Sequence, residues 1–146
     1  MKTASWVLLA IVGALMLLGS IASLFTAYRS AAPDPLTPSI TLDDVAAGRP
    51  EVATAIRARR GTAAAFAAAY AVLFLSVVLG PYRRGDTWSW WALLASALTL
   101  GILTAARIPA LGTRAGAGTG LVSLAVVAVA LLLDVRRLRA APPARD

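Results

Sequence analysis

The chain has 146 residues, of which 59% are hydrophobic, with a mean hydropathy of +0.75, a formal net charge of +7 and no cysteine. Soluble domains are only about 45–50% apolar, so this composition indicates a membrane protein. The chain also contains no His, Asn or Gln, which excludes thiolate nucleophiles, disulfide exchange, Cys/His zinc sites, histidine-held haem and the Ser-His-Asp triad.

Four apolar segments each approach the ~20 residues that a helix needs to cross a bilayer. They are residues 4–27, 62–79, 87–106 and 115–133. Because the second and third connections are short, the segments predict an all-α, polytopic transmembrane four-helix bundle with antiparallel up-down topology. Residues 1–146 are then a single integral membrane domain.

The first segment follows Lys2 and has two interpretations. A secretory signal has an apolar core of about 7–15 residues followed by small residues, and Ser20-Ile21-Ala22 fits such a cleavage site. The apolar run continues to Phe25, however, and this length favours a retained membrane helix.

Residues 29–56 form the one sizeable extramembrane segment. Three prolines impose extended or turn geometry near its start; they are Pro33, Pro35 and Pro38. Thr41 is a predicted N-cap of a short helix that ends at Gly48. Pro50 and Glu51 suit the first turn of a longer helix, whose first turns lie outside the bilayer.

The stretch GPYRRGDTWSWW, residues 80–91, separates the second and third apolar segments. Gly80 and Pro81 predict the end of the second helix, and Asp86 either caps the third helix or pairs with an arginine. The flanking basic and aromatic side chains are predicted interfacial anchors at headgroup depth; they are Arg83, Arg84, Trp88, Trp90 and Trp91. Recognition of a specific lipid or partner stays open as the alternative.

Small residues recur every four positions on the third and fourth segments and predict close contact between these helices. They are Ala97, Gly101 and Ala105 on the third segment, and Gly112, Gly116 and Gly120 on the fourth.

Two further groups of polar side chains are candidate sites. Three lie within the predicted spans, where hydroxyl groups need partners inside the protein: Tyr70, Ser96 and Thr99. Four arginines on one predicted face are candidates for binding a lipid headgroup or another anion: Arg57, Arg60, Arg107 and Arg114. Internal salt bridges with acids of the same face are the alternative for the arginines: Asp43, Asp44 and Glu51.

Orientation depends on the distribution of Lys and Arg, which is equal on the two sides. Seven lie on the side of the termini: Lys2, Arg83, Arg84, Arg136, Arg137, Arg139 and Arg145. Seven lie on the other: Arg29, Arg49, Arg57, Arg59, Arg60, Arg107 and Arg114. Because charges in short loops and next to helix ends weigh most, we expect both termini in the cytoplasm.

The segments RARRGTAAAFAAAY and PYRRGDTWSWWALL resemble small uncharacterised four-span membrane proteins of GC-rich bacteria. The resemblance implies an architecture and a location in the bacterial cytoplasmic membrane, and it implies no activity. No carboxylate lies inside a predicted span, which argues against proton-coupled export. We therefore expect an accessory, structural or lipid-interacting subunit; the alternative is a small transporter or channel for an apolar or anionic solute.

The remaining expectations follow from the same inventory of side chains. No motif assembles a catalytic site, a metal site or a cofactor site, so we expect no enzyme activity. The expected partners are membrane lipids, other membrane subunits or a second copy of the chain. Nucleic acid is not an expected partner, because the arginines lie at the ends of apolar segments.

Overall fold

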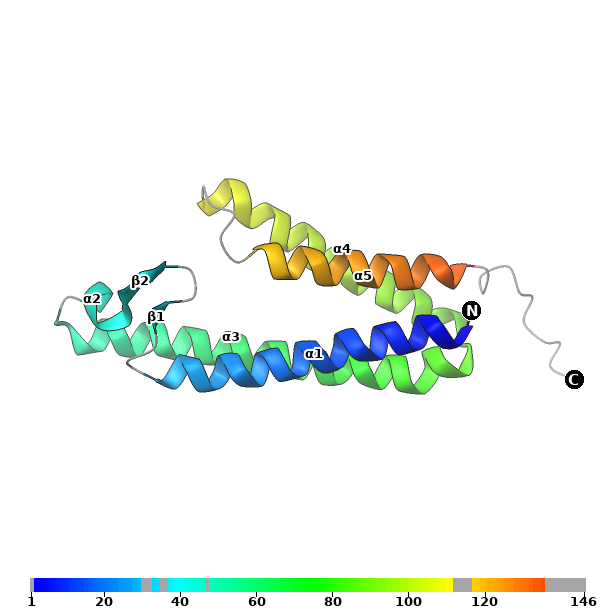
Figure 1. The fold of residues 1–146 in the computed structure, drawn as a ribbon, viewed down its shortest axis with the longest axis horizontal. Helices are drawn as coiled ribbons and strands as arrows, with labels where there is room; N and C mark the ends of the chain where they lie inside the picture. The colour runs from blue at the N-terminus through cyan, green and yellow to red at the C-terminus, as the bar shows by residue number, and fades with distance from the viewer. Residues whose placement is uncertain (1, 30–32, 35–36, 47, 112–116, 136–146) are drawn as a thin grey trace, which may run out of the picture. The chain divides into compact units, whose positions relative to one another are not determined.

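The computed structural model describes residues 2–29, 33–34, 37–46, 48–111 and 117–135, most of which are helical (Figure 1). The long helices are α1 (Lys2–Tyr28), α3 (Pro50–Val77), α4 (Thr87–Leu111) and α5 (Ala117–Leu133), and the five-residue π-helix η1 (Val78–Tyr82) directly follows α3. The short elements are β1 (Pro33–Asp34), β2 (Thr37–Thr41) and α2 (Leu42–Ala46). The prediction of a helical protein is confirmed, and the small antiparallel pair β1–β2 is an addition to it.

Three helices of the described chain have the length and apolar composition needed to cross a membrane. They comprise Ala4–Tyr28 with 25 residues, Pro50–Tyr82 with 33 and Thr87–Ala106 with 20. The fourth predicted span corresponds to a shorter apolar helix, Gly120–Leu133. Three of the four predicted spans therefore match helices of sufficient length.

The chain divides into two compact units, each described here by itself. The first unit combines Met1–Gly13 with Phe74–Asp146, so that it holds the start of α1, η1, α4 and α5. The second unit is Ala14–Leu73, which holds the rest of α1, the short elements and most of α3.

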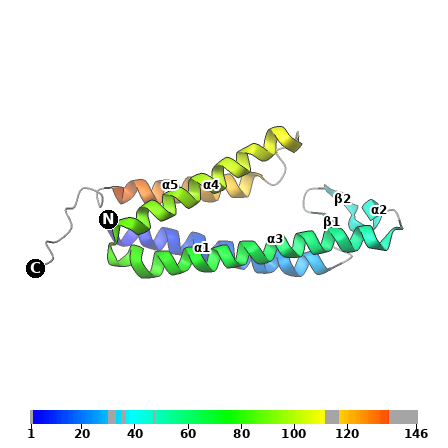
Figure 2. The same cartoon turned by 180° about the vertical axis from the view of Figure 1, so that it is seen from behind.

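Within the first unit, α4 and α5 lie side by side (Figures 1 and 2). A methyl group added at Gly101 would lie 3.6 Å from Leu124 Cδ1, and one at Gly120 would lie 3.7 Å from Thr104 Cγ2. The predicted contact of small residues is confirmed at these two glycines. Gly112 and Gly116 lie outside the described residues.

The prediction that the second helix ends at Gly80 and Pro81 is wrong. Pro81 has no N–H, and its ring conflicts with regular α-helical geometry. The chain accommodates Pro81 in η1, where the N–H of Arg83 bonds to the carbonyl of Val78, five residues back. Helical structure therefore continues through Arg84.

Gly85 ends this helix instead. Its φ of 105° lies in the region that glycine adopts most readily. The N–H of Gly85 bonds to the carbonyl of Tyr82, and the N–H of Asp86 bonds to that of Pro81, each at 3.1 Å. These two bonds form a Schellman motif, which satisfies the last carbonyls of the helix.

The second unit has a small apolar core of its own, in which Leu42 and Ala46 of α2 pack against Ala53 in the first turns of α3. The predicted short helix after Thr41 is confirmed as α2. Gly48, with a φ of 75°, follows α2, and α3 begins at Pro50 as predicted.

Two glycines permit close contacts, one in each unit. A methyl group added at Gly13 would lie 2.7 Å from Leu75 Cδ2 in the first unit, so α1 contacts the last turn of α3 closely there. In the second unit, a methyl group at Gly61 would lie 2.6 Å from Tyr28 Oη. Tyr28 is exposed, so its side chain has room to move away from a methyl group at Gly61. Of these two glycines, Gly13 is therefore the one that an added methyl group would disturb.

Candidate functional site

A buried group of polar side chains connects the helices of the first unit. We call it the capping cluster and define it as Ser5, Tyr82 and Trp90 with the carbonyl groups of Ala130 and Leu131. Ser5 Oγ lies 2.6 Å from Tyr82 Oη and donates a hydrogen bond of 2.8 Å to the carbonyl of Ala130. Trp90 Nε1 donates to the carbonyl of Leu131 at 3.1 Å. Ser5 and Tyr82 are both fully buried.

The direction of the hydrogen bonds follows from the number of protons. A serine hydroxyl carries one hydrogen, and that of Ser5 points to the carbonyl of Ala130, which can only accept. The Tyr82 hydroxyl must therefore donate to Ser5 Oγ. The result is a directed chain from η1 through α1 to α5.

The capping cluster satisfies carbonyl groups at the end of α5. The last four carbonyls of a helix have no regular intrahelical donor. The N–H of Asp134 bonds to the carbonyl of Leu131, three residues back, at 3.2 Å. Ser5 supplies a donor for Ala130, and Trp90 supplies another for Leu131. The end of α5 is thus capped by side chains from two other helices.

The predicted anchors of the 80–91 stretch differ in their environments. Trp88 and Trp91 are 58% and 55% exposed, whereas Trp90 is 6% exposed. The Trp90 ring also contacts Trp91 edge-on, with ring centroids 5.0 Å apart. Trp88 and Trp91 have the exposure that an interfacial anchor requires, and Trp90 instead belongs to the contact between α4 and α5.

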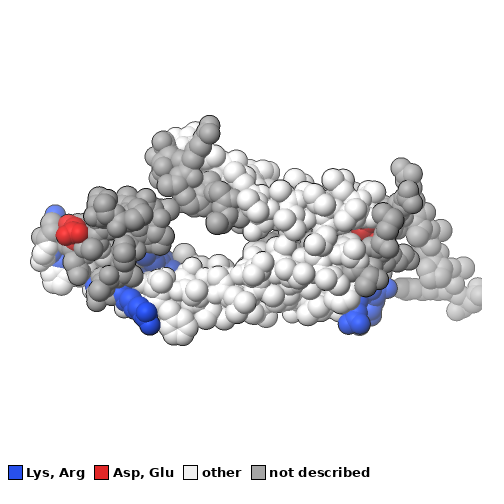
Figure 3. All heavy atoms as spheres, viewed as in Figure 1, with Lys and Arg blue, Asp and Glu red and all other residues white. Residues whose placement is uncertain are grey.

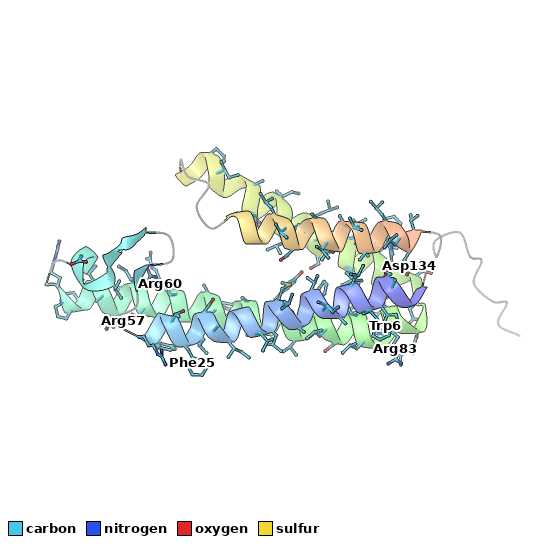
Figure 4. The ribbon with its side chains drawn as sticks, viewed as in Figure 1. Trp6, Phe25, Arg57, Arg60, Arg83 and Asp134 are labelled. Carbon is cyan, nitrogen blue, oxygen red and sulfur yellow. The ribbon has the colours of Figure 1, made fainter. Side chains whose placement is uncertain are left out.

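Arg83 and Arg84 are exposed and form the last two helical residues after η1. The guanidinium carbon of Arg83 lies 4.9 Å from the centroid of the Trp6 ring (Figure 4). This distance is within the range of a cation–π contact. In Figure 3, broad areas of the visible surface between the Lys and Arg atoms belong to uncharged residues.

Of the four candidate arginines for anion binding, the structure describes the side chains of two, which lie on the same helix. Arg57 and Arg60 are half-buried on α3, whereas the side chain of Arg107 and all of Arg114 lie outside the described residues. Their convergence stays a prediction.

The three intramembrane polar candidates also differ. Thr99 Oγ1 donates to the carbonyl of Ala95 in its own helix at 2.9 Å, so its partner is local. Tyr70 and Ser96 are half-buried. Among the described residues, no group of three or more His, Cys, Asp or Glu side chains is placed to hold a metal ion.

The sequence did not reveal the roles of Ser5 and Tyr82. Ser5 lies at the start of the first predicted apolar segment and Tyr82 lies just after the second, and neither position suggests a long-range partner. The available signal is a general one, because the last carbonyl groups of any membrane helix need donors.

Comparison of the chain with protein-family models, with curated proteins and with solved structures finds no significant match. The class therefore follows from the structure itself: the described residues are mostly helical and include three helices that are long and apolar enough to cross a membrane.

Proposed function

We propose that the protein is an accessory or lipid-interacting subunit of the bacterial cytoplasmic membrane, folded as an antiparallel four-helix bundle with both termini in the cytoplasm. The observation that carries this proposal is the exposure of large apolar side chains along the helices. Leu18 of α1, Ile102 of α4 and Leu132 of α5 are 63%, 67% and 66% exposed. Soluble monomers rarely expose large apolar patches, so lipid is the environment that suits this surface.

The spacing of charges along α3 and η1 supports the same proposal. Residues 61–82 contain no charged side chain. At ~1.5 Å per residue they form a helical length of about 33 Å, which matches the ~30 Å thickness of the hydrocarbon core. Arg60 and Arg83 flank this length and would then lie near the two headgroup layers.

The capping cluster supports the inclusion of α5 as the fourth helix of the bundle. The described part of α5 has 17 residues, a length of about 25 Å. Its last carbonyls would lie close to the hydrocarbon, where an unsatisfied polar group is costly. Ser5 and Trp90 donate to two of these carbonyls, so α5 can end there.

An accessory role agrees with how the polar side chains of the first unit are used. Ser5 and Trp90 are engaged in bonds that join helices, and Ser89 Oγ donates to the carbonyl of Asp86 just before α4 at 2.5 Å. These bonds stabilise structure. They do not form a polar path of the kind that a transporter needs.

The proposal is tested by fractionation followed by native mass spectrometry. The protein should stay in the membrane pellet after an alkaline carbonate wash and should enter solution only with detergent. After gentle extraction it should carry a stoichiometric partner subunit or a defined set of lipids. Release by carbonate would refute membrane integration. A homo-oligomer that carries only a small solute would refute the accessory role in favour of transport.

A further inference from the structure

We propose that Arg83, held against the ring of Trp6, forms a docking point for the phosphate group of an anionic membrane lipid. The inference rests on the proposed membrane location and specifies which residue contacts which part of the lipid. It concerns the end of the first unit where the start of α1 meets the turn after η1 (Figure 4).

The geometry fixes the position of the Arg83 guanidinium. Its central carbon lies 4.9 Å from the Trp6 centroid, which restricts a side chain that otherwise has many rotamers. An aromatic face contacts the plane of a guanidinium and leaves its in-plane N–H groups directed outward. The ordering that lipid binding would otherwise require is therefore already present in the protein.

The donors of Arg83 are available to a ligand. Arg83 is exposed, and no hydrogen bond or ion pair joins its guanidinium to another residue in the described part of the chain. A planar guanidinium matches the geometry of phosphate oxygens through two parallel N–H···O bonds. Asp86, three residues after Arg83, is exposed. Its backbone N–H and carbonyl form hydrogen bonds in the turn and at the start of α4.

The surroundings indicate a lipid phosphate in preference to a free phosphate ion. Leu79, one turn before Arg83, is 48% exposed, and Trp88 and Trp91 at the start of α4 are more than half exposed. Aromatic rings of this kind suit the boundary between headgroups and acyl chains. A lipid would thus contact the guanidinium through its phosphate and the apolar side chains through its acyl chains.

The position of Arg83 distinguishes it from Arg84. Both residues are exposed and adjacent, yet the ring contact involves Arg83. If the docking point depends on the aromatic support, Arg83 should contribute more to lipid selectivity than Arg84. If binding depended on charge alone, the two arginines would be equivalent.

The test compares lipid retention by the full-length protein in detergent, measured by native mass spectrometry and by thermal unfolding. The probes are phosphatidylglycerol, which is anionic, phosphatidylcholine, which is zwitterionic, and soluble glycerol phosphate. The variants are Arg83→Gln, Arg83→Lys and Arg84→Gln. Arg59→Gln, which removes an exposed arginine from α3 in the second unit, is the matched control.

We expect the wild type and Arg59→Gln to retain phosphatidylglycerol over phosphatidylcholine. Arg83→Gln should weaken this retention about tenfold, a change expected for the loss of one charge-assisted pair. Arg83→Lys should weaken it less, because lysine binds phosphate as a point charge. Arg84→Gln should have a smaller effect than Arg83→Gln, and glycerol phosphate should not raise the unfolding temperature.

The ring contact is tested with Trp6→Phe, which keeps an aromatic face, and Trp6→Leu, which removes it. Only Trp6→Leu should lower phosphatidylglycerol retention toward the Arg83→Gln value, provided that its circular dichroism matches the wild type. Equal retention by Arg83→Gln and Arg59→Gln would overturn the inference, as would stabilisation by glycerol phosphate. These outcomes leave the membrane location intact, whereas release of the protein by carbonate would refute the proposed function itself.

Discussion

The capping cluster makes a quantitative prediction for Ser5→Ala. Ser5 Oγ takes part in two buried interhelical bonds, accepting from Tyr82 and donating to the carbonyl of Ala130. Interhelical hydrogen bonds in membrane proteins contribute about 0.6 kcal/mol on average and up to about 1.7 kcal/mol. Removing both bonds should therefore lower the free energy of unfolding by about 1 to 3 kcal/mol. The measurement is unfolding by sodium dodecyl sulfate in mixed micelles, followed by circular dichroism.

Ser20→Ala is the matched control for this measurement. Ser20 is also a buried serine of α1, but its hydroxyl donates to the carbonyl of Met16 in the same helix. The hydrogen bond lost in Ser20→Ala lies within one helix, so we expect a change below about 0.5 kcal/mol.

A double-mutant cycle with Tyr82→Phe isolates the bond between the two hydroxyl groups. In the Ser5→Ala background, Tyr82→Phe should cost about 0.6 kcal/mol less than in the wild type, since the shared bond is already lost. Strict additivity of the two substitutions would refute the directed chain of hydrogen bonds. An effect of Ser5→Ala no larger than that of Ser20→Ala would do the same.

Three further predictions use glycines and the absence of native cysteine. Gly13→Ala should lower the free energy of unfolding by about 1–3 kcal/mol, because the added methyl group overlaps the Leu75 side chain. Gly19→Ala places its methyl group in open space and should be neutral or stabilising. Equal effects of the two substitutions in the same detergent titration would contradict the packing at Gly13. Gly85→Ala should cost about 1–3 kcal/mol in strain at a φ of 105°, and an unchanged thermal unfolding temperature would argue against that turn. Single cysteines introduced at positions 49 and 86 should react with an impermeant maleimide from opposite sides of the membrane. Arg49→Cys should react in intact cells, and Asp86→Cys should react only after permeabilisation. The reverse pattern would invert the proposed orientation.

The helical segments were predictable because hydropathy and helix signals act locally. Pro50 marks the start of α3 as expected, and the third predicted span begins where α4 begins, at Thr87. The error at Gly80 and Pro81 arose because the two residues usually stop an α-helix. A π-turn changes the hydrogen-bond register and admits proline, and no local pattern in the sequence distinguishes this outcome.

The candidate site was less predictable because it depends on contacts between distant residues. Trp88, Trp90 and Trp91 have the same local character, yet only Trp90 reaches a carbonyl of α5. Ser5 and Ala130 are 125 positions apart, and nothing near either residue indicates the other. Such contacts depend on helix packing, which the apolar pattern constrains only loosely.

The capping of α5 by Ser5 and Trp90 has a consequence for the biogenesis of the protein. A chain is made from its N-terminus, so the helices that carry both donors leave the ribosome well before the carbonyls that accept from them. Until α5 docks, a hydroxyl and an indole N–H lie beside lipid without these partners. Incomplete chains therefore expose two polar groups that are hydrogen-bonded in the finished protein.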